Sequence, residues 1–400
     1  MRIVIAGAGQ AAASMAARLR ARGHGGEIVL IGEEPVPPYQ RPPLSKGYLL
    51  GKMPLERLVL RGPEWWAENQ IALRVSERVV GIDREAREIE TERGREGYDA
   101  LALTLGAVPR RLPAAIGGAR GGVHVVRSLA DIDRLEPELV PGRRLVVVGG
   151  GYIGLEAAAV ARKLGLEVTV VEAGARILGR VASAPMAGLI RDLHRRHGVE
   201  VIEGAAVEAL EGGARVEAVR LADGRALACD LAIVGIGIEP GTGLAAAAGL
   251  AVANGIAVDE FGRTSDPAIW AAGDCASFPY GAGRLRLESV GNAIEMAEAV
   301  ADNILGAGAP YVPKPWFWSD QYDAKLQIAG LATGADRGIL RHGEDGSASI
   351  WSFAGERLLC VEALNDARAY MVGKRLIDAG RSPDPAAVED PATDLKTLMR

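Results

Sequence analysis

Two glycine-rich segments have the composition and spacing that a bound dinucleotide requires. The first is GAGQAA at residues 7–12, which follows a β-branched segment at residues 2–6. Glycines in such a turn allow a tight bend and let backbone amides approach a pyrophosphate, and the helix that begins there adds partial positive charge. Ala12 replaces the usual third glycine, a position that needs only a small residue. Glu33 lies 24 residues after Gly9, where a carboxylate binds ribose hydroxyls.

The second segment is a complete GxGxxG pattern at Gly149, Gly151 and Gly154, directly behind a β-branched run. Glu172 lies 21 residues after Gly151. An acidic side chain at that position favours a free ribose 2′-hydroxyl and repels a 2′-phosphate, so the segment predicts binding of NADH rather than NADPH. Arg176 leaves an alternative open, because an arginine there either meets a 2′-phosphate or is simply solvated.

The elements around these turns repeat the order strand, helix, strand. The first copy covers residues 2–6, 11–22 and 27–31, and the second covers residues 145–148, 154–164 and 167–171. Each copy predicts a βαβ unit with parallel strands and a right-handed crossover. The fold class is therefore predicted to be α/β, with two Rossmann-like dinucleotide-binding domains.

The remaining segments predict smaller elements and a third domain. Residues 74–97 are charged and alternating, which favours a small antiparallel sheet. Residues 306–315 are rich in Gly and Pro and are interpreted as a linker. Beyond it, an alternating stretch at residues 349–353 and a helical pattern at residues 365–379 predict a C-terminal α+β domain.

Composition limits the possible partners and location. A chain of 400 residues is long enough for two or three domains. The net charge of -5 gives no reason to expect a nucleic-acid partner. The N-terminus lacks the order of a signal peptide, and the longest apolar region, residues 145–161, contains four glycines and Glu156. We therefore expect a cytoplasmic protein that does not span a membrane.

Cysteine and histidine spacing exclude two kinds of site. Cys229, Cys275 and Cys360 are 46 and 85 residues apart, so the chain has no CxxC or CxxxxC pair. The five histidines show no zinc spacing, and no metal site is expected. The arginine-rich run at residues 191–196 is interpreted as a solvated helix face.

The order of five motifs resembles a known family. These are GAGQAA at 7–12, PYQRPPLSK at 38–46, GGGYIGLE at 149–156, AAGDC at 271–275 and PWFWSDQ at 315–321. Together they resemble the pyridine-nucleotide flavoprotein reductases, and in detail the ferredoxin reductases of bacterial oxygenase systems, of the putidaredoxin reductase type. The resemblance spans nearly the whole chain.

This resemblance implies a glutathione reductase-like architecture of three domains. It implies an FAD-binding domain made of residues 1–108 and 240–311, an NAD-binding domain of residues 109–239, and a C-terminal interface domain of residues 312–400. It also implies an NADH-dependent ferredoxin reductase. FAD would take hydride from NADH and pass electrons singly to a [2Fe–2S] ferredoxin that serves a monooxygenase or dioxygenase.

The resemblance assigns site residues by position. The implied FAD contacts are Gly7, Gly9, Ala11, Ala12, Glu33, Arg41, Lys46, Val79, Arg127, Gly273, Asp274, Val290 and Trp318. The implied NAD contacts are Gly149, Gly151, Tyr152, Ile153, Gly154, Glu172 and Gly237. Lys46, Glu156 and Trp318 are the candidate catalytic residues: Lys46 points towards the flavin and pairs with Glu156, and Trp318 shields the isoalloxazine.

Two departures from the family pattern affect local contacts. The chain has Thr104-Leu105-Gly106 where the family usually has Ala-Thr-Gly, and Pro240-Gly241 where it usually has Pro-Asn. We expect the first to weaken a backbone contact and the second to alter a loop contact, with the cofactor assignment unchanged.

Two alternatives remain. A disulfide reductase or an NADH oxidase or peroxidase on the same fold needs a cysteine beside the flavin, and residues 38–46 contain none. A redox-sensitive flavin-binding interaction module is the alternative of another class, and rapid NADH turnover with a one-electron acceptor would argue against it.

Overall fold

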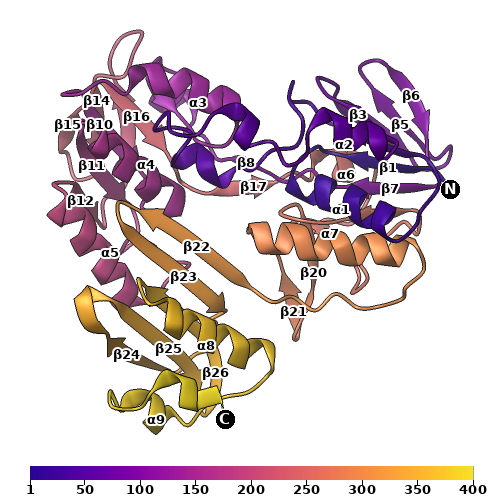
Figure 1. Cartoon of the computed structure of the whole chain (residues 1–400). Coiled ribbons are helices and arrows are strands. Elements are labelled where there is room, and N and C mark those ends of the chain that lie inside the picture. Colours follow the sequence, from indigo (N-terminus) through magenta and orange to yellow (C-terminus); the bar gives the residue numbers. More distant parts are fainter. Residues whose placement is uncertain (400) are drawn as a thin grey trace. The chain divides into compact units, whose positions relative to one another are not determined.

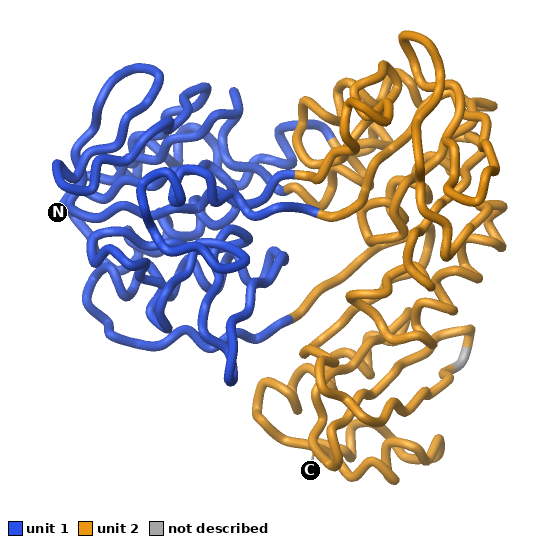
Figure 2. Tube along the Cα trace, turned by 180° about the vertical axis from the view of Figure 1, so that it is seen from behind, with its two compact units in different colours: residues 1–40, 54–108, 238–315 blue, residues 41–53, 109–237, 316–400 orange. Residues whose placement is uncertain are grey.

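The computed structural model describes residues 1–399, and these fold into two compact units (Figure 2). Unit 1 consists of residues 1–40, 54–108 and 238–315, and unit 2 consists of residues 41–53, 109–237 and 316 onward. Each unit therefore draws its core from three segments that are distant in the sequence.

Unit 1 is built on a parallel sheet with the strand order β19-β7-β1-β2-β3. Figure 1 labels β1, β3 and β7 of this sheet. Its strands are β1 (Ile3–Ala6), β2 (Ile28–Ile31), β3 (Ile71–Arg74), β7 (Ala100–Leu103) and β19 (Ile269–Ala271). Every residue of β1, β2 and β7 is buried, as in central parallel strands covered on both faces. Helix α1 (Gln10–Ala21) connects β1 to β2, so the first predicted βαβ unit is confirmed.

Helix α1 lies beside α7 (Val290–Ile304) in unit 1 (Figure 1). Buried alanines on both helices, among them Ala16 and Ala297, allow this close approach. Arg18 and Arg22 on α1 both bind the Asp302 carboxylate on α7, with shortest N–O distances of 2.7 and 2.8 Å. Hydrogen bonds from the two guanidiniums lower the pKa of Asp302, so this pair of helices is also held by charge.

Smaller elements complete unit 1. They are α2 (Pro63–Glu68), α6 (Gly243–Ala247), β4 (Val79–Asp83), β5 (Glu88–Thr91), β6 (Gly94–Gly97), β18 (Ile256–Ala257), β20 (Ala276–Tyr280) and β21 (Gly283–Leu285). The antiparallel β4-β5-β6 sheet confirms the prediction for residues 74–97. β8 (Ala107–Pro109) and β17 (Ile238–Pro240) form a two-stranded sheet.

Unit 2 contains a second parallel sheet with the strand order β12-β11-β10-β16-β9. Its strands are β9 (Val123–His124), β10 (Arg144–Val148), β11 (Glu167–Glu172), β12 (Glu200–Glu203) and β16 (Leu231–Val234). Helix α4 (Tyr152–Lys163) connects β10 to β11, which confirms the second predicted βαβ unit. The remaining elements are α3 (Leu129–Leu135), α5 (Ala184–Arg196), β13 (Val207–Glu211), β14 (Ala218–Leu221) and β15 (Ala226–Ala228).

The C-terminal part of unit 2 is an antiparallel sheet with helices, as the α+β prediction required. Its strand order is β22-β23-β26-β25-β24. The elements are β22 (Trp316–Gln321), β23 (Ala324–Gly330), β24 (Arg337–His342), β25 (Ala348–Ala354), β26 (Arg357–Leu364), α8 (Ala367–Asp378) and α9 (Pro385–Glu389). Trp351 and Phe353 are buried with Tyr370 of α8 in one apolar core, so the sheet and α8 form two layers that pack against each other.

The α/β fold class is confirmed, whereas the proposed boundaries of three domains stay a prediction. The two units place residues 109–237 and 316 onward together, and they assign residues 41–53 to unit 2. Among the helices of residues 1–399, none combines the length and the apolar character needed to cross a bilayer.

Candidate functional site

The first glycine turn joins β1 to α1 and leaves open space above its backbone. Gly7 has φ +103°, and an added Cβ would lie 2.4 Å from the Thr104 carbonyl oxygen, so a side chain is excluded there. Gly9 is the N-cap of α1 and offers no side chain to the first-turn amides. An added Cβ at Gly9 would meet nothing within 4 Å. The amide groups at the start of α1 are therefore not capped by a side chain and can be approached closely, as binding of a pyrophosphate would require.

Other predicted FAD residues of unit 1 surround this turn. Glu33 follows β2, and its side chain is 68% exposed with Arg78 3.7 Å away, so the carboxylate remains accessible to ribose hydroxyls. Gly273 has φ +81°, and its Cβ would lie 3.2 Å from Ala11 Cβ. The structure thus brings the Gly273-Asp274 turn against the start of α1.

The second glycine turn repeats the geometry of the first in unit 2. Gly149 has φ +106°, and its added Cβ would lie 2.4 Å from the Gly235 carbonyl oxygen. Gly151 is the N-cap of α4, with no other atom nearer than 4.0 Å to an added Cβ. At Gly154 a Cβ would lie 2.4 Å from the Gly149 carbonyl oxygen, so the third glycine is required by close packing.

Glu172 at the end of β11 is oriented by the turn itself. Its Oε2 accepts from the Gly150 amide at 2.7 Å, and its Oε1 accepts from the Gly174 amide at 2.6 Å. Each carboxylate oxygen keeps a further lone pair that can accept from a ribose hydroxyl. Arg176 is half-buried and binds the Leu178 and Gly179 carbonyl oxygens at 3.5 and 3.3 Å. The side chain therefore contacts its own loop, and the preference for NADH over NADPH stays a prediction that rests on Glu172.

Lys46 and Glu156 form a buried ion pair within unit 2. Lys46 Nζ lies 2.6 Å from Glu156 Oε2, and the two side chains are 19% and 2% exposed. The hydroxyls of Ser45 and Ser319 also donate to this carboxylate, at 2.5 and 2.6 Å. Burial raises the pKa of Glu156, and the Lys46 ammonium and the two hydroxyls oppose that rise. The cluster is therefore a buried carboxylate whose neighbours are all donors.

The alternation of β22 determines which of its side chains join this cluster. Successive strand residues point to opposite faces. Phe317 packs on Tyr152 of α4 with ring centroids 4.3 Å apart, and Ser319 reaches Glu156 on the same face. Trp318 therefore lies on the other face, where it stacks on Trp316 with centroids 5.4 Å apart. The structure does not place Trp318 in the Lys46 cluster.

Three residues behind the cluster were missed by the sequence analysis. Gln321 Nε2 donates to Ser319 Oγ at 3.1 Å, and His194 Nε2 lies 2.7 Å from Gln321 Oε1. The Tyr322 hydroxyl lies 3.3 Å from His194 Nδ1. Interpretation of residues 191–196 as a solvated face is wrong for His194, which is 0% exposed.

A signal for His194 was present in the sequence of α5. The buried residues of this helix are Met186, Ala187, Ile190, Leu193 and His194. Their spacing is that of one apolar helix face, so the histidine belongs to the buried stripe despite its basic neighbours. Gln321 had a weaker signal, since it is two residues from Ser319 on the same face of a strand.

Other predicted contacts are divided between the two units. In unit 2, Arg41 Nη1 donates to the Arg127 carbonyl oxygen at 2.8 Å, and Gly237 accepts from the Arg110 amide at 2.9 Å. Ile153, the second residue of α4, is 44% exposed beside the glycine turn. In unit 1, Val79 begins β4 and Val290 begins α7. Since the FAD residues come from both units, their convergence on one flavin stays a prediction.

Comparison with known proteins identifies the family. The family model described as pyridine nucleotide-disulphide oxidoreductase matches residues 1–297, and the model described as reductase C-terminal matches residues 316–399. The chain belongs to the pyridine nucleotide-disulphide oxidoreductase family. Within it, the chain is of the ferredoxin reductase type found in oxygenase systems.

Individual relatives agree along the full length. Rhodocoxin reductase of Rhodococcus erythropolis is 42% identical over 404 residues, covering 100% of this chain and 94% of the relative. The ferredoxin–NAD(+) reductase component of the p-cumate 2,3-dioxygenase system of Pseudomonas putida is 37% identical, covering 99% and 98%. A chain of the covalent putidaredoxin reductase–putidaredoxin complex superposes with a TM-score of 0.95 at 39% identity, covering 100% of this chain and 98% of that one.

The two departures from the pattern of this oxidoreductase family face each other in unit 1. An added Cβ at Gly241 would lie 3.0 Å from the Leu105 carbonyl oxygen and 3.1 Å from Leu105 Cβ. Glycine at 241 therefore makes room for leucine at 105. Thr104 supplies a nearby hydroxyl, which donates to the Ala6 and Gly7 carbonyl oxygens at 3.1 and 3.0 Å. This hydroxyl ties the residue after β7 to the first glycine turn, and the expected weakening of a backbone contact at Leu105 stays a prediction.

The cysteines of this oxidoreductase are unsuited to redox chemistry. Cys229, Cys275 and Cys360 are all free and buried. Burial raises the pKa of the Cys229 and Cys275 thiols to about 11 and raises that of Cys360 as well. Because the thiolate is the nucleophile, these thiols are inert at neutral pH. Within residues 1–399, no group of His, Cys, Asp or Glu side chains forms a candidate metal site.

Thiol-blocking reagents are therefore expected to leave NADH-to-ferricyanide activity largely intact. The measurement is activity after treatment with N-ethylmaleimide, with mass spectrometry to count modified cysteines. Stoichiometric inactivation at one cysteine of the folded protein would contradict this and restore the disulfide-reductase alternative.

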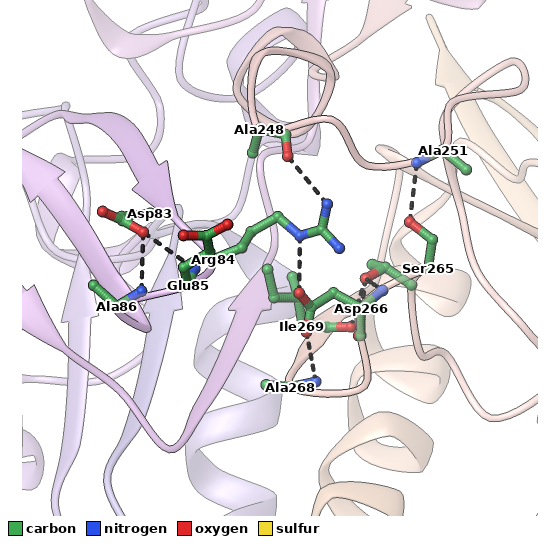
Figure 3. A network of polar contacts seen from close by, with 11 residues as sticks. Asp83, Arg84, Glu85, Ala86, Ala248, Ala251, Ser265, Asp266, Ala268 and Ile269 are labelled. Atoms are coloured by element: carbon green, nitrogen blue, oxygen red, sulfur yellow. Dashed lines mark hydrogen bonds and ion pairs between the residues drawn. The ribbon is translucent and has the colours of Figure 1, made fainter.

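An open pocket of about 710 Å³ in unit 1 is separate from both glycine turns. It lies between the β4–β5 hairpin and the Ser265–Ile269 loop, where Arg84 Nε donates to Asp266 Oδ2 at 2.8 Å (Figure 3). Asp266 is further held by the Ala268 amide at 3.0 Å. No predicted site residue among residues 1–399 lines this pocket. Its main ion pair is satisfied internally, so it is not the dinucleotide site.

Proposed function

We propose that the chain is an FAD-containing reductase that oxidises NADH and passes electrons singly to a [2Fe–2S] ferredoxin of an oxygenase system. The observation that carries this proposal is the pair of glycine turns built to one geometry, one in each unit. Two dinucleotides can then be held by one chain. The relatives' names supply the partner class, ferredoxin, and the oxygenase system that it serves.

Unit 1 is proposed to hold FAD. Its turn at Gly7 and Gly9 would receive the pyrophosphate, and Glu33 would bind a ribose. Asp274 and the start of α7 would contact the ribityl and phosphate part. When bound, the flavin supplies the chemistry that links a two-electron hydride donor to a one-electron acceptor.

Unit 2 is proposed to hold NADH. The turn at Gly149 and Gly151 would receive the pyrophosphate, and Glu172 would accept from both ribose hydroxyls. The negative charge of Glu172 at this turn supports a preference for NADH over NADPH. Exposed Ile153 would cover part of the bound nucleotide.

Lys46, Glu156 and Trp318 are proposed to act beside the flavin, on the basis of the sequence resemblance. The Lys46 ammonium would stabilise negative charge on the ring, and Glu156 would orient the lysine. Trp318 would cover the isoalloxazine. The three-domain boundaries and a cytoplasmic location are proposed on the same sequence basis.

The deciding experiment is NADH-driven reduction of cytochrome c with and without a [2Fe–2S] ferredoxin from the same organism. Strong dependence on ferredoxin is expected. Absence of turnover with every ferredoxin, despite a full complement of FAD, would favour the interaction-module alternative. Thiol-dependent turnover would favour the disulfide-reductase alternative.

Alanine at the two N-cap glycines is expected to separate the two cofactor sites. The added Cβ at Gly9 or Gly151 meets little in the protein, so Gly9→Ala and Gly151→Ala should both fold. Gly9→Ala should lower the FAD content, whereas Gly151→Ala should keep FAD and raise the KM for NADH by about tenfold. The added methyl group would lie where the pyrophosphate approaches the turn, and it would weaken the hydrogen bonds from the backbone amides. Flavin absorbance and steady-state kinetics measure the two effects. Normal FAD in Gly9→Ala would contradict the assignment of unit 1.

A further inference from the structure

We propose that Ser319, Gln321, His194 and Tyr322 are positioning residues whose hydrogen bonds form a chain that holds Glu156 as an anion and so fixes Lys46. The inference rests on the proposed role of Lys46 beside the flavin. All of these residues belong to unit 2. The chain extends from the carboxylate of α4 through β22 to the buried face of α5.

Each link of the chain has one allowed direction. A carboxylate can only accept, so the Ser319 hydroxyl donates to Glu156 Oε1 at 2.6 Å. The Ser319 oxygen then accepts from the Gln321 amide nitrogen at 3.1 Å. This leaves Gln321 Oε1 as the acceptor towards His194 Nε2, 2.7 Å away. His194 must therefore carry its proton on Nε2.

At the far end of the hydrogen-bond chain, Tyr322 also donates in the direction of Glu156. With the proton on Nε2, His194 Nδ1 is an acceptor, and the Tyr322 hydroxyl donates to it at 3.3 Å. Burial lowers the pKa of His194 to about 4, so the ring is neutral at physiological pH. Tyr322 is held in turn by stacking on His197, with ring centroids 3.7 Å apart. Four successive donors thus point towards Glu156.

The surroundings of Glu156 explain why such a chain is needed. Facing its carboxylate are Lys46 and Ser45 from the loop at residues 41–53, Ser319 from β22, and Tyr152 from its own helix. Lys46 is the one cation in this set. An anion this deeply buried is costly unless every oxygen is hydrogen-bonded. The hydrogen-bond chain supplies that bonding at Oε1, whereas Lys46 and Ser45 bind Oε2.

The groups around His194 do not provide a competing charge partner. Facing its ring are Gln321 and Tyr322 from β22 and the turn after it, and His197, the residue after α5. His197 opposes protonation of His194. The histidine is therefore a neutral link that orients Gln321, and it does not transfer a proton, because a glutamine amide separates it from Ser319.

The first measurement tests the hydrogen-bond chain directly and requires no reaction with NADH. In protein labelled with ¹⁵N-histidine, His194 is expected to be neutral from pH 6 to pH 8 with its proton on Nε2, as ¹⁵N chemical shifts report. His194→Leu assigns the signal. A protonated His194 at neutral pH, or a proton on Nδ1, would overturn the proposal.

The second measurement is flavin reduction by NADH in stopped flow. Ser319→Ala, which removes one oxygen, is expected to slow reduction by about tenfold, the usual effect of one hydrogen bond to a charged group. His194→Leu removes a hydrogen bond between neutral groups and should slow reduction by about fivefold. His194→Gln should restore most of the rate, because its amide can donate in place of Nε2–H. Arg196→Ala, at an exposed position of α5, is the matched control.

Two comparisons distinguish positioning from general stability. In a Lys46→Met background, Ser319→Ala should add no further slowing, because the chain acts through Lys46. In the protein that keeps Lys46, loss of the Ser319 donor raises the pKa of Glu156. As the pH is lowered, the reduction rate of Ser319→Ala should therefore begin to fall at a higher pH than the rate of the parent protein. An additive effect in the double variant, with an unchanged pH profile, would overturn the proposal.

The controls separate this inference from the function on which it rests. If Lys46→Met alone leaves flavin reduction unchanged, the proposed role of Lys46 fails, and this inference fails with it. If Lys46→Met slows reduction but Ser319→Ala and His194→Leu do not, the inference alone is overturned and the proposed function stands.

Discussion

Replacement of Lys46 by methionine is expected to slow flavin reduction by NADH about a hundredfold while FAD stays bound, an effect of the size seen when one fixed donor of a charge-stabilising site is removed. The ammonium is fixed by Glu156 at 2.6 Å and is only 19% exposed, so little water screens it. Hydride transfer brings negative charge to its acceptor, and a fixed cation favours that product. A charge pair at ~4 Å in an effective dielectric of ~20 is worth about 4 kcal/mol before desolvation reduces it.

Glu156→Gln is also expected to slow flavin reduction, but by less than Lys46→Met. The Lys46 ammonium then remains and loses only the partner that orients it. Stopped-flow reduction and the flavin midpoint potential are the measurements. Lys52→Met removes an exposed lysine of the same loop and serves as the matched control. If neither variant changes the reduction rate or the potential, the ion pair has only a scaffolding role.

Replacement of Glu172 is expected to reduce the preference for NADH over NADPH about a hundredfold, since a charge-assisted hydrogen bond and a repulsion between like charges are both lost. The side chain is oriented by the Gly150 and Gly174 amides, so the carboxylate is held in a defined direction at the end of β11. Glu172→Gln keeps one acceptor and removes the charge. Glu172→Arg removes the acceptor as well as the negative charge and adds a cation, so it should reduce the preference for NADH further.

The ratio of kcat/KM for the two donors measures this change. Glu167→Gln, at the exposed start of the same strand β11, is the control. A parent enzyme that prefers NADPH, or a Glu172→Arg variant whose ratio is unchanged, would show that the nucleotide ribose does not lie against Glu172.

Glu172 could be identified from a local sequence pattern, whereas Lys46 and Glu156 were assigned through the resemblance to a family. The constraints on each glycine turn act within about twenty residues: a positive φ, a close backbone approach, and a helix that begins at a glycine N-cap. Gly7 and Gly149 meet these constraints with φ values of +103° and +106°. Since hydrophobic periodicity and turn chemistry are local, the two βαβ units and the C-terminal α+β part were also predictable.

Other features depended on contacts that no local pattern encodes. Pairing of β19 with β7 and the division of the chain into two units of three segments each arise from packing between distant segments. The packing of Leu105 against Gly241 is likewise a contact between distant segments of the sequence. Sequence analysis identified both as departures but had no means of relating them.

By itself, the sequence determined that this protein has two dinucleotide turns, an acidic residue after each, and no cysteine in the segment where a disulfide reductase needs one. Only the tertiary structure decided which polar side chains surround Glu156. Ser319 is 163 residues away from it, and His194 is 127 residues from Gln321. The physical reason is that a buried carboxylate requires donors on every side, and a folded chain supplies them from whichever elements pack against its helix.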